Sequence, residues 1–164
     1  MTEIEIFEQL FELGKTAQDP EGVVVACLVE DDNVILSSPS ANDGIRHAED
    51  LLLEQAKISG IDINDKVILY VTLEPCSYRS PKNNVDDCTT IIIKAGIKNI
   101  IYAAPDPEYS QEARDRFLKA GVSYQMTQDK DITLKAINLF NNTITIPLTS
   151  MNLPRKKTIP QELE

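Results

Sequence analysis

The 164-residue sequence predicts an α/β protein, a three-layer α/β/α sandwich built around a five-stranded mixed sheet. Segments with helical periodicity alternate along the chain with short apolar segments rich in Val and Ile. Two of the apolar segments stand close enough to form an antiparallel hairpin, whereas helices separate the later ones, as parallel strands require. The length favours one domain, which we expect to span residues 1–148. Prolines at 154 and 160 break any periodicity after that, so residues 149–164 are predicted to be a mobile C-terminal tail.

The N-terminal part predicts a helix followed by the hairpin. Thr2 and Glu5 form a possible capping box, and apolar residues then recur at helical spacing until Pro20. The hairpin consists of a valine-rich strand over residues 23–29 that is buried on both faces, a turn over 31–33 and a second strand over 34–36.

The remaining chain alternates helices with strands. Gly60, Gly96 and Gly121 each follow a helical pattern, which is where a helix commonly ends. After a polar loop over 37–46, the predicted elements are helices over 47–59, 88–94, 110–120 and 131–140 and strands over 67–73, 99–103 and 122–126, with a long polar loop over 74–87.

Composition narrows the function classes. Lys and Arg total 16 against 26 Asp and Glu, a net charge of −10, which disfavours a polyanionic partner such as DNA or RNA and favours a small-molecule substrate. The N-terminus lacks a signal-peptide pattern, and the longest unbroken apolar run is too short to cross a bilayer. We therefore expect a cytoplasmic protein without a membrane partner. Three cysteines in such a chain argue against a disulfide framework.

Three residues form a candidate metal site. His47 is the only histidine, and two of the three cysteines, Cys76 and Cys88, lie in one later segment. Structural zinc is usually closed by four protein ligands, whereas catalytic zinc keeps three and leaves a position for water. The sequence thus predicts one catalytic Zn²⁺ per chain. Cys27, inside a predicted buried strand, is interpreted as a packing residue.

Glu49 is the candidate catalytic residue. It follows His47 by two positions, so in the first turn of a helix its carboxylate can lie beside the metal-bound water without ligating the metal. A carboxylate there can accept a proton from water and return it to a leaving group. The alternative is a purely structural role, in which the acidic side chain only stabilises the start of the helix.

Five residues near the ligands are candidates for substrate binding. Cations that flank the ligands could bind a phosphate or a ribose, and polar side chains ahead of His47 could contact the substrate. Exposed loop residues of these types are also commonly just solvated. The candidates are Asn42, Asp43, Arg46, Arg79 and Lys82.

Two segments carry a family resemblance. His-x-Glu together with Pro-Cys-x-x-Cys is the signature of zinc nucleobase deaminases. His47-Ala48-Glu49 matches the first half, and Thr72–Ser77, reading T-L-E-P-C-S, resembles the pyrimidine deaminase domain of bifunctional riboflavin-biosynthesis proteins, a branch of the cytidine and deoxycytidylate deaminase superfamily. The likeness covers about Glu3 to Ile146. The second half of the signature is not matched, because eleven residues, 77–87, separate Cys76 from Cys88 where the signature has two.

The resemblance implies a cytidine deaminase-like fold and a homo-oligomer. It also implies a zinc-dependent hydrolase that deaminates an amino-substituted pyrimidine or related heterocycle, as free base, nucleoside or nucleotide, and releases ammonia. A riboflavin-pathway-like intermediate is one such substrate.

Two alternatives stay open. Base deamination in tRNA or a single strand uses the same chemistry, but it needs a basic, often aromatic-lined track. The net charge and the small number of aromatic residues, five Tyr and four Phe, weigh against it. A catalytically idle partner subunit is the other alternative, suggested by the altered spacing of the cysteines.

Overall fold

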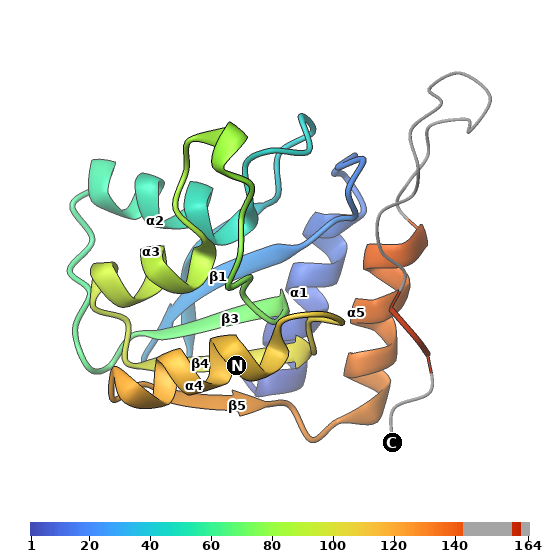
Figure 1. The fold of residues 1–164 in the computed structure, drawn as a ribbon. Helices are drawn as coiled ribbons and strands as arrows, with labels where there is room; N and C mark the ends of the chain where they lie inside the picture. The colour runs from blue at the N-terminus through green and yellow to red at the C-terminus, as the bar shows by residue number, and fades with distance from the viewer. Residues whose placement is uncertain (143–158, 162–164) are drawn as a thin grey trace.

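The computed structural model describes residues 1–142 and 159–161 and shows one central sheet with helices on both faces (Figure 1). The strand order is β2-β1-β3-β4-β5. The predicted three-layer α/β/α sandwich with a five-stranded mixed sheet is therefore confirmed. In chain order the described elements are α1 (Glu3–Gly14), β1 (Val25–Glu30), β2 (Asn33–Pro39), α2 (Ala48–Ile58), β3 (Ile68–Leu73), the 3₁₀ helix η1 (Pro81–Asn83), α3 (Cys88–Ala95), β4 (Asn99–Ala104), α4 (Ser110–Lys119), β5 (Ser123–Met126) and α5 (Lys130–Asn142).

The connections set the strand directions. β1 pairs antiparallel with β2, to which it is joined by a tight turn, and also antiparallel with β3. β3, β4 and β5 run parallel, because each consecutive pair is joined through a helix. The ends of β3 and β4 therefore lie at the same edge of the sheet as the start of β1. The Val25 amide, for example, donates to the Thr72 hydroxyl at 3.0 Å. This edge positions the candidate site.

Helices α1 and α5 cover one face of the sheet. The predicted capping box is present, since the Glu5 amide donates to the Thr2 hydroxyl and the Glu5 carboxylate accepts from the Thr2 amide. Behind this cap, the apolar side of α1 packs against β1, β3 and α5 in one buried cluster. Cys27 belongs to this cluster and has no exposed surface, which supports its interpretation as a packing residue.

Helices α2, α3 and α4 cover the other face (Figure 1). Their buried side chains, among them Leu52, Ile92 and Phe117, pack against the opposite side of β1, β3 and β4. Both α2 and α3 begin at the sheet edge described above. Their first residues therefore meet the segment that follows β3.

Most predicted boundaries differ from the structure by one or two residues, and two of the differences are informative. β2 continues to Pro39, whereas the sequence predicted a loop from Ser37, because polar residues on the outer face of an edge strand imitate a loop. Helix α2 begins at Ala48 rather than His47, which has extended backbone angles (φ −82°, ψ 161°) and serves as the N-cap.

Most of the predicted tail, 149–164, lies outside the described residues. Within this segment the Ile159 side chain is only 2% exposed and joins the α1 and α5 cluster, while the mobility of the tail stays a prediction. The Asn141 side chain forms two hydrogen bonds with the backbone of Ile159. Nδ2 donates to the Ile159 carbonyl and Oδ1 accepts from the Ile159 amide, each at 3.0 Å. Within the described residues, no helix has the length and apolar character to span a membrane.

Candidate active site

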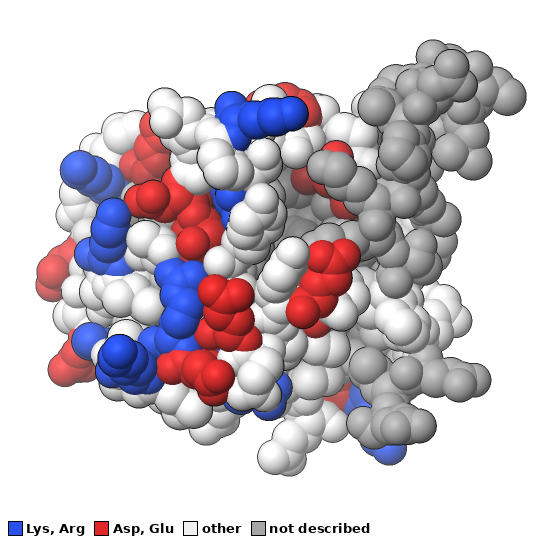
Figure 2. All heavy atoms as spheres, in the orientation of Figure 1, with Lys and Arg blue, Asp and Glu red and all other residues white. Residues whose placement is uncertain are grey.

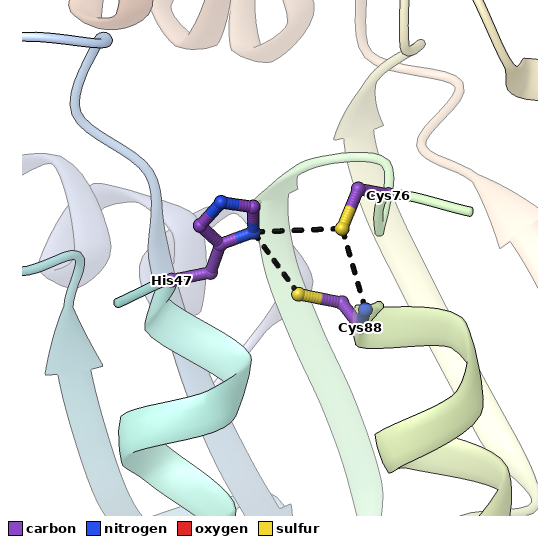
Figure 3. A group of neighbouring side chains, drawn as sticks. All are labelled: His47, Cys76 and Cys88. Atoms are coloured by element: carbon purple, nitrogen blue, oxygen red, sulfur yellow. Dashed lines mark hydrogen bonds between the residues drawn. The ribbon is translucent and has the colours of Figure 1, made fainter. Parts of the chain in front are cut away.

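His47, Cys76 and Cys88 come together at the edge of the sheet where β3 ends (Figure 3). His47 is the N-cap of α2, Cys76 lies three residues beyond β3, and Cys88 is the first residue of α3. The His47 Nδ1 atom lies 3.2 Å from the Cys88 Sγ and 3.5 Å from the Cys76 Sγ. All three candidate ligand atoms lie within 4.8 Å of one another.

This donor set fits a zinc ion. Zinc binds thiolate sulfur at about 2.3 Å and imidazole nitrogen at about 2.0 Å, so N and S ligands of a tetrahedral ion lie about 3.5 Å apart. The two observed N to S distances, 3.2 and 3.5 Å, agree with that spacing. One imidazole and two thiols make three ligands, and within the described residues no further His, Cys, Asp or Glu joins the group. Three protein ligands are the pattern of a catalytic site.

The two cysteines are held together by the backbone around them. The Thr89 amide and hydroxyl donate to the Cys76 carbonyl at 3.0 and 2.8 Å, and the Cys88 amide donates to the Cys76 sulfur at 3.3 Å. Asp87 caps α3 by accepting from the Thr90 amide at 2.8 Å. The eleven-residue segment 77–87 is named here the ligand loop. These hydrogen bonds hold its two ends next to each other.

The local electrostatics favour a thiolate at Cys76. Hydrogen bonding with Cys88 is the largest influence and lowers the Cys76 pKa, and His47 lowers it further. Burial raises the pKa of Cys88, which is fully enclosed. For His47, burial alone would lower the pKa, but the hydrogen bond and charge of Cys76 together raise it.

Glu49 lies next to the ligands. As the second residue of α2 it is only 3% exposed. Burial raises its pKa, which favours holding a proton, while the charge of His47 works in the opposite direction. The structure therefore places a buried carboxyl group beside the three candidate ligands.

A cavity of about 290 Å³ opens beside this group. His47, Cys76 and Glu49 lie in its wall, so a molecule in the cavity would meet both the ligands and the carboxylate. Its wall also includes an aromatic pair, Tyr78 and Tyr109, with ring centroids 5.7 Å apart. The other lining residues are Asp19, Glu21, Gly22, Val24, Ser40, Gly44, Leu73, Glu74, Arg79, Ser80, Asn83, Asp106, Pro107, Glu108 and Phe140.

Of the five predicted substrate-binding residues, only Arg79 is in the cavity wall. Arg46 instead pairs with Asp50 and Glu54 on α2. The other three do not line the cavity either: the Asn42 side chain accepts from the Gln18 amide, the Asp43 carboxylate accepts from two amides of its own turn, and Lys82 is exposed on η1. A substrate-binding role for these four stays a prediction.

Sequence reasoning missed the acidic residues of the wall. Glu74 directly follows β3, and Asp106 lies two residues after β4. Ligands of open α/β sheets bind at the carboxyl ends of such parallel strands. That rule would have found both. Asp19 precedes β1, which runs the other way, so only the antiparallel pairing of β1 with β3 brings it to this edge.

Glu74 also ties the site to the rest of the sheet. Its Oε1 accepts from the Asp106 amide at 3.0 Å, and its Oε2 accepts from the Tyr124 hydroxyl. Asp106 in turn caps the loop after β4 by accepting from the Glu108 and Tyr109 amides at 2.8 and 3.2 Å. The segments after β3 and β4 are therefore fixed relative to each other.

Known proteins are similar to this chain in sequence and in fold. A family model described as the cytidine and deoxycytidylate deaminase zinc-binding region matches residues 2–104. The chain is 33% identical over 109 residues to the riboflavin biosynthesis protein RibD of Aquifex aeolicus, an alignment that covers 63% of this chain and 28% of that protein.

Two solved structures are similar to most of this chain. One is a diaminohydroxyphosphoribosylaminopyrimidine deaminase/5-amino-6-(5-phosphoribosylamino)uracil reductase of Thermotoga maritima, with a TM-score of 0.67, 26% identity and coverage of 80% of this chain and 39% of that chain. The other is RibD of Acinetobacter baumannii, with a TM-score of 0.69, 25% identity and coverage of 92% and 40%. This chain thus spans well under half the length of these relatives.

Proposed function

Because this chain belongs to the cytidine and deoxycytidylate deaminase family, we propose that it is a zinc-dependent hydrolase that deaminates an amino-substituted pyrimidine or a related heterocycle. The resemblance seen in His47-Ala48-Glu49 and Thr72–Ser77 is thereby confirmed at the level of the family. The observation that carries the proposal is the meeting of three zinc-type ligands with a buried carboxylate in the wall of one cavity.

His47, through Nδ1, and the sulfurs of Cys76 and Cys88 would hold the zinc ion. When bound, zinc supplies a strongly acidified water as the nucleophile for hydrolysis. The chain supports its own ligands: the Cys88 amide at the start of α3 donates to the Cys76 sulfur and stabilises negative charge there. Capping of α3 by Asp87 fixes the direction of that amide.

Glu49 would carry the protons. Burial raises its pKa, so that it could hold a proton between two transfers, and its side chain lies in the cavity wall together with two of the ligands. In deamination the carboxylate would accept a proton from the attacking water and pass it to a ring nitrogen. It would then take the second proton from the newly added hydroxyl group and give it to the amine, which leaves as ammonia while a carbonyl forms. A group that both accepts and donates protons must hold one position, and α2 supplies that rigidity.

The size of the cavity suits one heterocycle with a small substituent. Its volume of about 290 Å³ is at the low end for small-molecule sites. The Thermotoga relative is named for a phosphoribosylaminopyrimidine. The part of that compound that we propose for this chain as well is the riboflavin-pathway-like aminopyrimidine ring.

Ammonia release tests the proposal. The zinc-loaded protein is assayed against a panel of aminopyrimidines, aminopterins and aminopurines, as bases, nucleosides and nucleotides. We expect zinc-dependent release of one ammonia per product with at least one aminopyrimidine. If the loaded protein releases ammonia from no member of the panel, the proposed function is wrong and the idle partner subunit becomes the better interpretation.

Homo-oligomerisation and a cytoplasmic location belong to the same proposal. Both rest on the family resemblance and on composition. Light scattering of the purified protein and fractionation of cells test them separately from activity.

A further inference from the structure

The wall of the cavity beside the candidate zinc ligands is rich in carboxylates. Four of its acids are almost completely buried: Asp19 is 4% exposed, Glu49 3%, Glu74 2% and Asp106 7%. Glu21 and Glu108 line the same cavity. On the face drawn in Figure 2, acidic side chains border the hollowed middle of the molecule.

Arg79 is the one Lys or Arg that the structure places in this wall, within the described residues. Its Nε atom is buried without a hydrogen-bond partner among the described residues, whereas both terminal nitrogens contact other groups of the protein. Nη1 donates to the Asp86 carbonyl at 2.9 Å, and Nη2 donates to the Ile45 carbonyl at 2.7 Å. Nη2 also lies 3.3 Å from the Asp50 carboxylate, and the Arg79 side chain is only 3% exposed. Arg79 therefore fastens the ligand loop to the segment before α2 rather than offering a charge to a ligand.

A phosphate in this cavity would meet several carboxylates, whereas the one guanidinium of the described wall is buried and paired with Asp50. Phosphate sites in proteins are built from Arg, Lys and exposed backbone amides. Several candidate amides are already occupied here, because Asp106 accepts from the Glu108 and Tyr109 amides and Asp19 accepts from the Glu21 amide. Among these groups, the cavity therefore offers a phosphate neither an exposed cation nor an unoccupied backbone amide.

Carboxylates instead suit hydroxyl and amino substituents. An ionised carboxylate has about four acceptor positions, and Asp19 uses one of them for the Glu21 amide. Free positions can accept from sugar hydroxyls or ring amino groups. Tyr78, 55% exposed beside Tyr109, supplies an apolar surface on which a heterocycle can stack.

We propose that this site takes an unphosphorylated aminopyrimidine or related amino-heterocycle, a free base or a nucleoside-type compound with a neutral or positively charged substituent, and discriminates against the corresponding phosphate. This inference rests on the proposed deaminase function and specifies its substrate class. It separates the chain from the phosphorylated substrate named for the Thermotoga relative.

Matched substrate pairs test the inference. Ammonia release by the zinc-loaded protein is measured with cytidine and CMP, deoxycytidine and dCMP, and a ribosylated diaminopyrimidine with and without a 5′-phosphate. We expect kcat/KM to be at least about tenfold higher for the unphosphorylated member at low ionic strength. The ratio should fall as salt is added, because screening weakens the repulsion of the phosphate.

A charge-neutralising variant assigns the effect to the cavity. Asp19→Asn keeps the shape of a wall residue and removes one carboxylate charge, so the preference for the unphosphorylated member should shrink. Glu12→Gln is the matched control: Glu12 is an exposed residue of α1 outside the cavity, and its variant should keep the wild-type ratio. An equal change in both variants would assign the discrimination to net charge and would overturn the site-based inference.

The outcomes separate the inference from the proposed function. Preferred turnover of the phosphorylated members, with ammonia released, overturns the inference and leaves the deaminase function standing. If no pair is turned over, the proposed function is contradicted, and calorimetric titration of the zinc-loaded protein with uridine and with UMP still decides the inference. Tighter binding of UMP overturns it, and tighter binding of uridine supports it.

Discussion

The Tyr124 hydroxyl of β5 donates a hydrogen bond to the Glu74 carboxylate, which stands fifty positions earlier, two residues before Cys76. Burial raises the pKa of Tyr124, and the charge of Glu74 raises it further, so the phenol stays protonated and keeps donating. The other oxygen of Glu74 accepts from the Asp106 amide. One buried carboxylate thus connects the segments that follow β3 and β4 with the edge strand of the sheet.

Tyr124→Phe should destabilise the protein by about 1–2 kcal/mol, because the buried Glu74 carboxylate loses a donor that no water replaces. Urea denaturation of the zinc-loaded protein measures this loss. Tyr78→Phe is the control, since Tyr78 is 55% exposed, and its stability should match the wild type. Equal stabilities of the Tyr124→Phe variant and the wild type would mean that the hydrogen bond contributes nothing.

Glu49→Gln should lower ammonia release by about 10² to 10⁴-fold while zinc content and melting temperature stay close to wild type. The amide keeps the shape of the side chain but cannot carry protons. Glu54→Gln, a half-exposed change on the same helix, should leave the rate nearly unchanged. Retention of activity by the Glu49→Gln protein would remove Glu49 from the catalytic role.

Cys76→Ser and His47→Ala should each reduce bound zinc from one ion per chain to nearly none, because each removes one of three ligands. Metal analysis of the purified variants measures this. Chelation of the wild type should also lower its stability, by about 4 kcal/mol if free zinc had been a thousandfold above its dissociation constant. Cys27→Ala should keep its full zinc content, since Cys27 lies in the α1 and α5 cluster. Full zinc in either ligand variant would contradict the assigned set.

Cys27 should make stability depend on alkaline pH. Burial raises the pKa of its thiol from 9.0 to about 12. A group with a raised folded-state pKa contributes stability that is complete below its unfolded pKa and is lost as pH rises toward the folded one. The wild type should therefore lose about 1.4 kcal/mol per pH unit from this thiol above pH 9, up to about pH 12.

The Cys27→Ala variant should be less stable than wild type at pH 7, because a small cavity replaces the sulfur. Between pH 9 and 10.5 its stability should decline less steeply than that of the wild type. Urea denaturation at several pH values measures both slopes. Parallel slopes for the two proteins would show that the thiol does not titrate differently in the folded state.

Ile159→Ala should destabilise the protein by about 2–4 kcal/mol, which is the usual result of emptying a buried site of this size. The side chain is 2% exposed and packs in the α1 and α5 cluster. Ile58→Ala provides the comparison, because Ile58 is 73% exposed. Thermal and urea denaturation measure the stability of both variants. Equal losses of stability in the two variants would contradict the packing of Ile159.

Much of the fold could be predicted because its signals are local. Helical periodicity and caps gave the helices, and the rule that helices connect parallel strands gave the direction of β3, β4 and β5. The end of β2 could not be predicted in this way. Ser37 and Ser38 look like loop residues, and only their pairing with β1 makes them part of a strand.

The metal group could be predicted because few residue types bind zinc well and the chain has only one histidine. The cavity wall could not. Proximity in sequence to His47 gave Asn42, Asp43 and Arg46, but the direction of each side chain depends on local partners, such as Asp50 for Arg46. Asp19 reaches the wall only through the pairing of distant strands.

The hydrogen bonds between Cys76 and Thr89 separate the placing of the metal ligands from the lining of the cavity. A shorter connection between the two cysteines would have to serve both purposes with the same residues. The metal ligands are fixed by the backbone at the ends of the ligand loop, so the length and composition of the loop between them can change without moving either sulfur. Tyr78, Ser80 and Asn83 of that loop line the cavity. Related enzymes could therefore diverge in substrate through insertions at this one segment, and transplanting it between relatives offers a direct route to engineered specificity on an unchanged metal centre.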